Sequence, residues 1–172
     1  MNILRYLSPS CIQMSLHTVP AVPVEDESEQ QRQRRLVRDK EAVVQELATL
    51  MERSGQVNNA TRFFKDMLHR ERKATTAIVP GIALPHVRSM QVRSFVMGFA
   101  RAPAPGLHFA SLDGGLTRLF FILAAPPYED RLYLRVYRDF AEMIRHDWVV
   151  DSFLDAEDEQ DVLNILRGYV VQ

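Results

Sequence analysis

The chain of 172 residues has little of what several protein classes require. Its single cysteine, Cys11, excludes an intramolecular disulfide framework and a four-cysteine zinc site. No apolar run approaches the roughly 20 residues that a membrane-spanning helix needs, and we expect no secretory signal peptide. The 21 basic and 22 acidic residues nearly cancel, unlike the basic surface of a typical nucleic-acid-binding domain. We therefore expect neither membrane insertion nor a nucleic-acid partner.

What remains is the composition of an ordinary globular protein, with 47% hydrophobic and 25% charged residues. A chain of this length fits one domain and buries about 70% of its unfolded surface on folding. We place that domain at residues 36–172. Residues 1–35 form an N-terminal segment with a turn at Leu7–Ser10, a short strand over Cys11–Leu16 and then a flexible insertion that contains Pro20 and Pro23.

Charge changes sign along the end of this insertion. Residues 25–29 are acidic, and four arginines follow at Arg32, Arg34, Arg35 and Arg38. The order suits an exposed linker that runs into a solvated helix, because acidic residues are favoured at a helix N-terminus. The same arginines also permit a docking surface for an acidic partner or a nucleic-acid patch, although no aromatic residues lie between them.

Hydrophobic periodicity predicts two helices and then a sheet. A helix over 36–53 ends near Gly55, and Asn58 or Asn59 caps a second helix. Strands are predicted within 78–84 and over 95–100, and a central strand buried on both faces at 119–125. The helices that follow have these predicted ranges: 136–144, 147–154, and 155–167 with Gly168 as terminator. The order predicts an α/β three-layer sandwich, a small mixed β-sheet flanked by helices on both faces.

Among five histidines, only His86 lies in a local sequence that restricts the direction of the backbone. An apolar strand runs through Gly81–Leu84 into Pro85, which restricts the backbone before and after itself. The histidine that follows leaves the strand in a restricted direction, as a nucleophilic imidazole requires. A structural or simply exposed histidine fits the same pattern.

The segment Gly-Ile-Ala-Leu-Pro-His at 81–86 resembles the signature of EIIA domains of the fructose/mannitol and nitrogen-type phosphotransferase system. The family's upstream Arg-Glu pair corresponds to Arg70-Glu71, 16 residues before the histidine, and its threonine to Thr76. The turn around Asp113 and the central strand ending in Ala-Ala-Pro are also similar. The resemblance covers roughly residues 36–168.

The resemblance implies a phosphocarrier that needs no metal or organic cofactor. His86 would accept a phosphoryl group from the phosphohistidine of HPr and pass it to an EIIB component, or signal to a regulatory target. Arg70 would stabilise the charge of the phosphoryl oxygens. Thr76 would donate a hydrogen bond to the imidazole or to the phosphoryl group.

Simpler interpretations stay open for the same residues. Arg70 can cap the end of the second helix, where a cation is favoured, and Thr76 can be an ordinary strand residue. His108 fits an exposed loop. Neither His69 nor His146 has a recognisable metal-ligand spacing with His86.

Two departures from the family pattern weaken the expectation of efficient transfer. The family usually has a second active-site histidine, whereas this chain has Tyr133 there, a residue that cannot become a cation. Residues 77–80, Ala-Ile-Val-Pro, replace a loop that is often glycine-rich, so the loop is stiffer and bulkier. We predict a cytoplasmic EIIA-like phosphocarrier, regulatory rather than sugar-specific. The alternative is an impaired EIIA-like module that only binds a partner protein.

Overall fold

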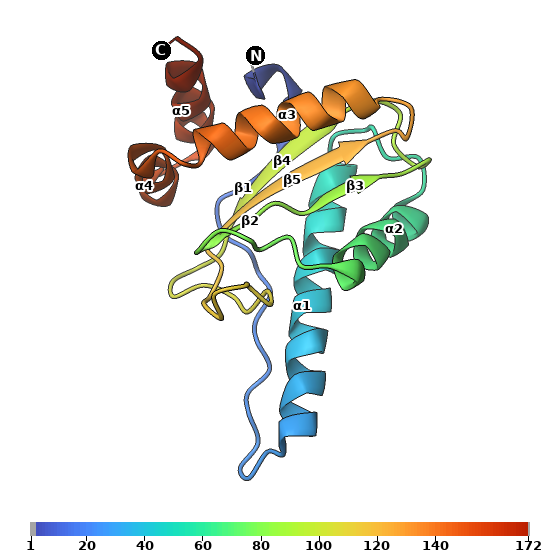
Figure 1. Cartoon of the computed structure of the whole chain (residues 1–172), viewed down its shortest axis with the longest axis vertical. Helices are drawn as coiled ribbons and strands as arrows, with labels where there is room; N and C mark the ends of the chain where they lie inside the picture. The colour runs from blue at the N-terminus through green and yellow to red at the C-terminus, as the bar shows by residue number, and fades with distance from the viewer. Residues whose placement is uncertain (1–2, 172) are drawn as a thin grey trace.

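A computed structural model describes residues 3–171 of the chain (Figure 1). In the described residues the elements follow one another in this order: η1 (Ile3–Tyr6), β1 (Leu7–Gln13), α1 (Glu29–Glu52), α2 (Ala60–Lys73), β2 (Ile82–Ala83), β3 (His86–Arg88), β4 (Val96–Arg101), β5 (Leu119–Ala125), α3 (Asp130–Met143), α4 (Asp147–Asp155) and α5 (Glu159–Val171).

The sheet is mixed and has β5 at its centre. Its order is β1-β4-β5-β2, and β3 also pairs with β5. Strand β4 is antiparallel to β5, while β2 and β3 both run parallel to it. Strands β2 and β3 therefore lie end to end along one side of β5, with Leu84 and Pro85 between them.

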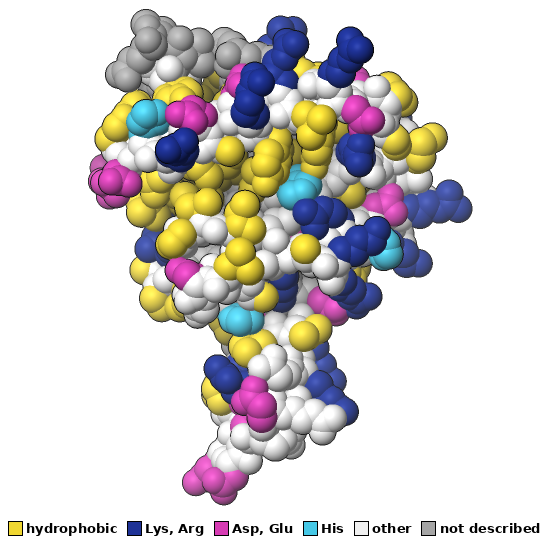
Figure 2. Space-filling model, in the orientation of Figure 1, with side chains coloured by type: hydrophobic (Ala, Val, Ile, Leu, Met, Phe, Trp, Pro, Cys, Tyr) yellow, Lys and Arg dark blue, Asp and Glu magenta, His cyan; other side chains and the backbone are white. Residues whose placement is uncertain are grey.

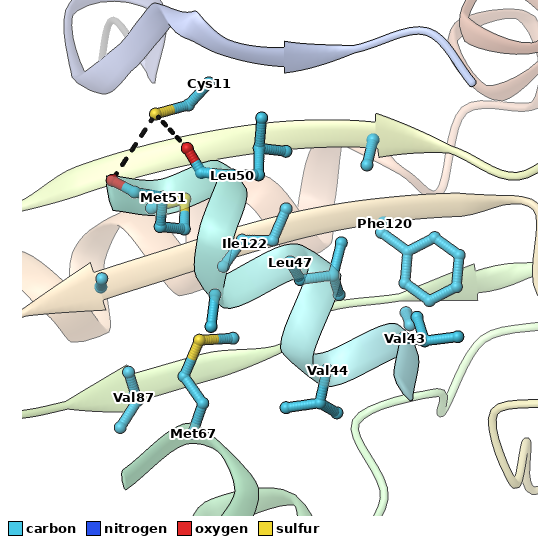
Figure 3. Packing of buried hydrophobic residues seen from close by; sticks show 14 of the residues in the cluster. Cys11, Val43, Val44, Leu47, Leu50, Met51, Met67, Val87, Phe120 and Ile122 are labelled. Atoms are coloured by element: carbon cyan, nitrogen blue, oxygen red, sulfur yellow. Dashed lines mark hydrogen bonds between the residues drawn. The ribbon is translucent and has the colours of Figure 1, made fainter. Parts of the chain in front are cut away.

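Helices cover both faces of the sheet, which confirms the predicted three-layer α/β sandwich. Helices α1 and α2 pack on one face and α3, α4 and α5 on the other (Figure 1). All seven residues of β5 are buried, and they alternate between the two cores. Phe120 and Ile122 point toward α1, whereas Phe121 and Leu123 point toward α3. The close-up in Figure 3 shows the first of these cores, where Leu47 of α1 lies beside Ile122.

Residues 18–38, which we call the arm, extend away from the sandwich (Figure 1). Within the arm, the start of α1 lies beside the segment that precedes the helix. The two are joined by polar contacts, because Glu46 accepts hydrogen bonds from the backbone of His17 and Thr18 at 2.6 and 2.8 Å. Arg35 also forms a two-pronged ion pair with Glu27.

Some predicted boundaries are wrong. The turn predicted at residues 7–10 belongs to strand β1, and α1 begins at Glu29 rather than near residue 36, so the predicted domain boundary at 35/36 falls inside this helix. Helix α5 continues past Gly168 to Val171. The predicted strand within 78–84 is reduced to the two residues of β2.

Candidate functional site

His86 is the first residue of β3, so it begins a strand rather than leaving one as predicted. The break at Leu84 and Pro85 places it there. The carbonyl of Pro85 accepts a hydrogen bond from the backbone of Leu123 at 2.9 Å, and His86 itself pairs with Leu123 across the sheet. The backbone of the histidine is thereby attached to the central strand.

Both ring nitrogens of His86 have a partner of defined polarity. Nδ1 lies 2.7 Å from the carbonyl oxygen of Leu84, and Nε2 lies 2.7 Å from Nη2 of Arg70. A carbonyl oxygen only accepts and a guanidinium only donates. Nδ1 therefore carries the proton, and the lone pair of Nε2 faces Arg70.

The surroundings favour the neutral form of this imidazole. Burial is the main cause that lowers the pKa of His86 below its ordinary value near 6.5, and the positive charge of Arg70 acts in the same direction. The hydrogen bond to Leu84 opposes both causes. At neutral pH the side chain is thus an uncharged base with its lone pair on Nε2.

Arg70 occupies the last turn of α2, where the structure shows its contact with the helix end and its contact with His86. Its Nη1 donates to the carbonyl oxygen of Ala74 at 3.0 Å, beyond the helix end, while its Nη2 reaches His86. The guanidinium is therefore fixed at two points, and its fork remains directed at the histidine.

Thr76 belongs to a buried network behind this pair rather than to the imidazole. Its backbone N–H and its hydroxyl donate to the carboxylate of Glu71 at 2.9 and 2.7 Å. The ammonium of Lys40 completes the network at 2.8 Å from Glu71. The Thr76 hydroxyl thus donates its hydrogen bond to Glu71, whereas the sequence predicts a hydrogen bond to the imidazole or to the phosphoryl group.

This network connects back to the histidine through the main chain. The carbonyl oxygen of Thr76 accepts a hydrogen bond from the backbone of Leu84 at 3.1 Å, and Leu84 holds Nδ1 of His86. Glu71 was noticed in the sequence only as half of the Arg-Glu pair, and Lys40 was missed. No local signal links Lys40 to residues that lie 31 positions further along the chain.

Two tyrosines of α3 form the opposite wall. The ring centroids of Tyr133 and Tyr137 lie 6.0 and 5.3 Å from that of His86. Tyr133 is only 8% exposed, and burial raises the pKa of its phenol to about 12. Tyr137 lies within the predicted helix 136–144, but its place beside the histidine was missed.

The remaining histidines lie outside this arrangement. His69 and His146 are exposed, and His108 is half-buried in the connection between β4 and β5. Within residues 3–171 no group of three or more histidine, cysteine, aspartate or glutamate side chains is arranged to hold a metal ion. None of the helices in that range is long and apolar enough to cross a bilayer.

Comparison with known proteins decides the family. The model of the phosphoenolpyruvate-dependent sugar phosphotransferase system EIIA 2 family matches residues 29–169. The chain belongs to this family. The matched range includes α1, His86, Arg70, Glu71, Thr76 and the two tyrosines of α3.

Relatives within this EIIA family include sugar-specific and nitrogen-type proteins. The fructose-specific EIIABC component of Bacillus subtilis is 27% identical over 77% of this chain, but the chain spans only 21% of that protein. A nitrogen regulatory protein of Bradyrhizobium diazoefficiens is 30% identical over 76% of this chain and 84% of its own length.

Solved structures share the EIIA fold. The nitrogen regulatory protein IIA-Ntr of Neisseria meningitidis matches with a TM-score of 0.74 and 22% identity, over 95% of this chain and 98% of that chain. Mannitol IIA of Escherichia coli, solved in complex with phosphorylated IIB, matches with a TM-score of 0.64 and 21% identity, over 75% and 88% of the two chains. At these identities the likeness establishes the fold alone.

Proposed function

We propose that this EIIA-family chain is a phosphocarrier whose His86 accepts a phosphoryl group from the phosphohistidine of an HPr-type protein. The observation that supports this proposal is the pair of contacts at the imidazole, with Nδ1–H bonded to Leu84 and Nε2 facing Arg70. An EIIB component then receives the phosphoryl group, or the phosphorylated chain acts on a regulatory target. The solved complex of a mannitol IIA with its IIB supports the first recipient as a class.

The transfer requires one bond to form and one to break. The lone pair of His86 Nε2 attacks phosphorus and forms a nitrogen–phosphorus bond. The nitrogen–phosphorus bond of the donor phosphohistidine breaks, and its electron pair stays on the donor imidazole. The Nδ1 proton of His86 remains on its ring, held by Leu84. The reaction therefore needs no oxidant, reductant or further substrate.

Arg70 lies beside Nε2, the atom to which the negatively charged phosphoryl group is transferred. Its Nη2 donates to Nε2, so the attacking lone pair becomes available as the guanidinium moves to the phosphoryl oxygens. A planar guanidinium can bind two such oxygens at once. Its second contact, to Ala74, limits how far it moves.

One observation favours a second candidate function, an EIIA-like module that binds a partner without efficient transfer. Tyr133 stands against the histidine where the family usually has a second histidine, and with a pKa of about 12 it stays uncharged at neutral pH. Tyr133 therefore adds no positive charge at the position where the family pattern has a second histidine, and the guanidinium of Arg88 lies 5.7 Å from the centre of its ring.

Phosphorylation by phosphoenolpyruvate, first enzyme and HPr, followed by intact-mass analysis, separates the two candidates. We expect one acid-labile phosphate on wild type and on the matched control His69→Ala, and none on His86→Ala. A folded wild-type chain that stays unlabelled, while a known EIIA is labelled in parallel, would contradict the phosphocarrier and leave the binding module.

A further inference from the structure

His86 lies at the boundary between two hollows of different chemistry. On one side is an apolar groove of about 300 Å³, whose lining includes Ile78, Leu84, Tyr137 and Ile144. On the other side is a polar hollow of about 500 Å³, lined among others by Asp66, His69, Arg70, Lys73, Arg88 and Met90. One ring-nitrogen partner of His86, Leu84, lines the groove, and the other, Arg70, lines the hollow.

The side of the polar hollow formed by α2 is basic because both acids of this helix are bonded to other residues, Asp66 at the hollow and Glu71 in the core. Asp66 accepts the hydroxyl proton of Ser89, and Glu71 is buried with Lys40. The helix also has five cations, Arg62, Lys65, Arg70, Arg72 and Lys73. Among residues 3–171, no ion pair is found for Arg62, Lys65 or Lys73, and all three are exposed.

Around α3, more of the cations are paired with acids than along α2. Arg88 is paired with Asp130 at the start of α3, Arg138 within that helix with Asp139, and Arg145 beyond its end with Glu142. Arg131 and Arg135 of α3 are exposed, and no ion pair is found for them among residues 3–171. Figure 2 shows the result on this face of the molecule. Lysine and arginine side chains gather on the side of α2, others lie over α3, and a band of hydrophobic side chains lies below α3.

The apolar neighbours indicate a protein rather than a nucleic acid as the molecule that covers this surface. Ile78 is 51% exposed at the groove, and Met90 is 73% exposed at the hollow. Protein interfaces combine an apolar centre with a polar rim, whereas nucleic-acid surfaces present mainly phosphates to a basic protein.

Resting on the proposed function, we infer that the protein that delivers the phosphoryl group to His86 carries a patch of carboxylate side chains that docks over α2. Its own apolar residues cover the groove beside Tyr137. The charge of α2 then steers the donor into one orientation, because complementary charge acts mainly on the rate and geometry of encounter.

The test reverses the charge of α2 without touching the hydrogen-bonded partners of His86. Arg62 and Lys73 lie on the helix face that also carries Asp66 and His69, so the variant is Arg62→Glu/Lys73→Glu. The matched control is Arg34→Glu/Arg38→Glu, which makes the same change at exposed arginines of the arm. The second-order rate constant of transfer is measured with phospho-HPr from the organism that encodes this chain, at low and high salt. A second readout is the labelling of His86 by phosphoramidate, which requires no docking.

We expect the α2 variant to lose about tenfold in the rate constant at low salt, and most of this loss to disappear at high salt. The arm variant and all phosphoramidate labelling should match wild type. An unchanged or larger rate constant in the α2 variant would overturn the acidic donor and leave the phosphocarrier intact. Wild type that phosphoramidate labels but phospho-HPr does not would overturn both. Binding of duplex DNA that the α2 variant loses, with an unchanged transfer rate, would replace the acidic protein by a nucleic acid.

Discussion

The two sides of the His86 ring, one formed by α2 and the other by α3, contact it through different interactions. We call them the first and the second wall. On the side of α2, Arg70 makes directional hydrogen bonds, and a buried carboxylate is bonded to Lys40 and Thr76 behind it. On the side of α3, Tyr133 and Tyr137 contribute aromatic faces and no hydrogen bond to the imidazole among the described residues. Arg70, together with the Leu84 carbonyl, sets the tautomer, while the tyrosines pack against the ring, whose burial is the main cause of its lowered pKa. Changes to the two walls should therefore have different consequences.

The largest expected effect is a loss of stability on the first wall. Glu71→Ala leaves the ammonium of Lys40, which is 16% exposed, without its carboxylate. Removing one partner of a buried ion pair costs about 3–5 kcal/mol, so we expect a loss near 3 kcal/mol in the free energy of unfolding, measured by urea denaturation. Glu71→Ala/Lys40→Met should recover part of it. A single variant within 1 kcal/mol of wild type would show that the network does not stabilise the fold.

Arg70→Ala should instead affect the reaction. We expect phosphoryl transfer to slow about a hundredfold, because a guanidinium on the transferred phosphoryl group is a major source of charge stabilisation. Stability should fall by less than about 1 kcal/mol, since only the contacts at the helix end are lost. The matched control is Arg72→Ala, which removes a neighbouring arginine that pairs with Glu41 away from His86. Equal rates for the two variants would remove Arg70 from the mechanism.

On the second wall, Tyr133→His should speed transfer about tenfold if the missing second histidine limits the rate, because an imidazole can carry a positive charge near neutral pH. Tyr133→Phe serves as its control. Among the described residues no hydrogen bond of the Tyr133 hydroxyl is found, so we expect this control to stay within about twofold of wild type. A Tyr133→His rate equal to that of wild type would reject the assignment of the departure to this position.

The smallest effect concerns pH. The pKa of His86 is lowered by burial and by Arg70, and protonation would remove the attacking lone pair. An imidazole with the ordinary pKa of about 6.5 is half protonated at pH 6.5. Between pH 7.5 and 6.5 such an ordinary imidazole loses about 1.8-fold of its neutral form, so the labelling of His86 by phosphoramidate should fall by less than this and reach half of its maximum below pH 6.5. A midpoint at or above pH 6.5 would show that the ring is not held neutral.

The sequence predicted the parts of the fold that depend on local pattern. The wholly apolar run at 119–125 is the central strand, and Asn59 caps α2 through a hydrogen bond to the backbone of Arg62 at 3.0 Å. Strand β1 was missed in part because Ser8 and Pro9 are typical of turns. They are tolerated here because β1 is an edge strand, where a missing N–H costs little.

The early start of α1 was missed because polar contacts rather than apolar periodicity stabilise it. Ser28 caps the helix together with Gln31, and Arg35 is tied to Glu27. In the site, the family pattern located His86 and Arg70, and the structure brings the two together. The roles of all four predicted site residues stay predictions. The Lys40–Glu71 pair joins two helices, and Tyr137 is a half-buried residue of an amphipathic helix, so neither could be assigned from local sequence.

The single cysteine, Cys11, can report on the contact between β1 and α1. Cys11 lies in β1 under the end of α1, where its thiol donates to the carbonyl oxygen of Leu50 at 3.3 Å (Figure 3). Burial raises its pKa, so little reactive thiolate forms while the helix stays in place. The rate at which a thiol reagent labels Cys11 therefore reports how often α1 separates from the edge of the sheet. Measuring this labelling rate with and without phosphate on His86 shows whether phosphorylation changes the opening of α1.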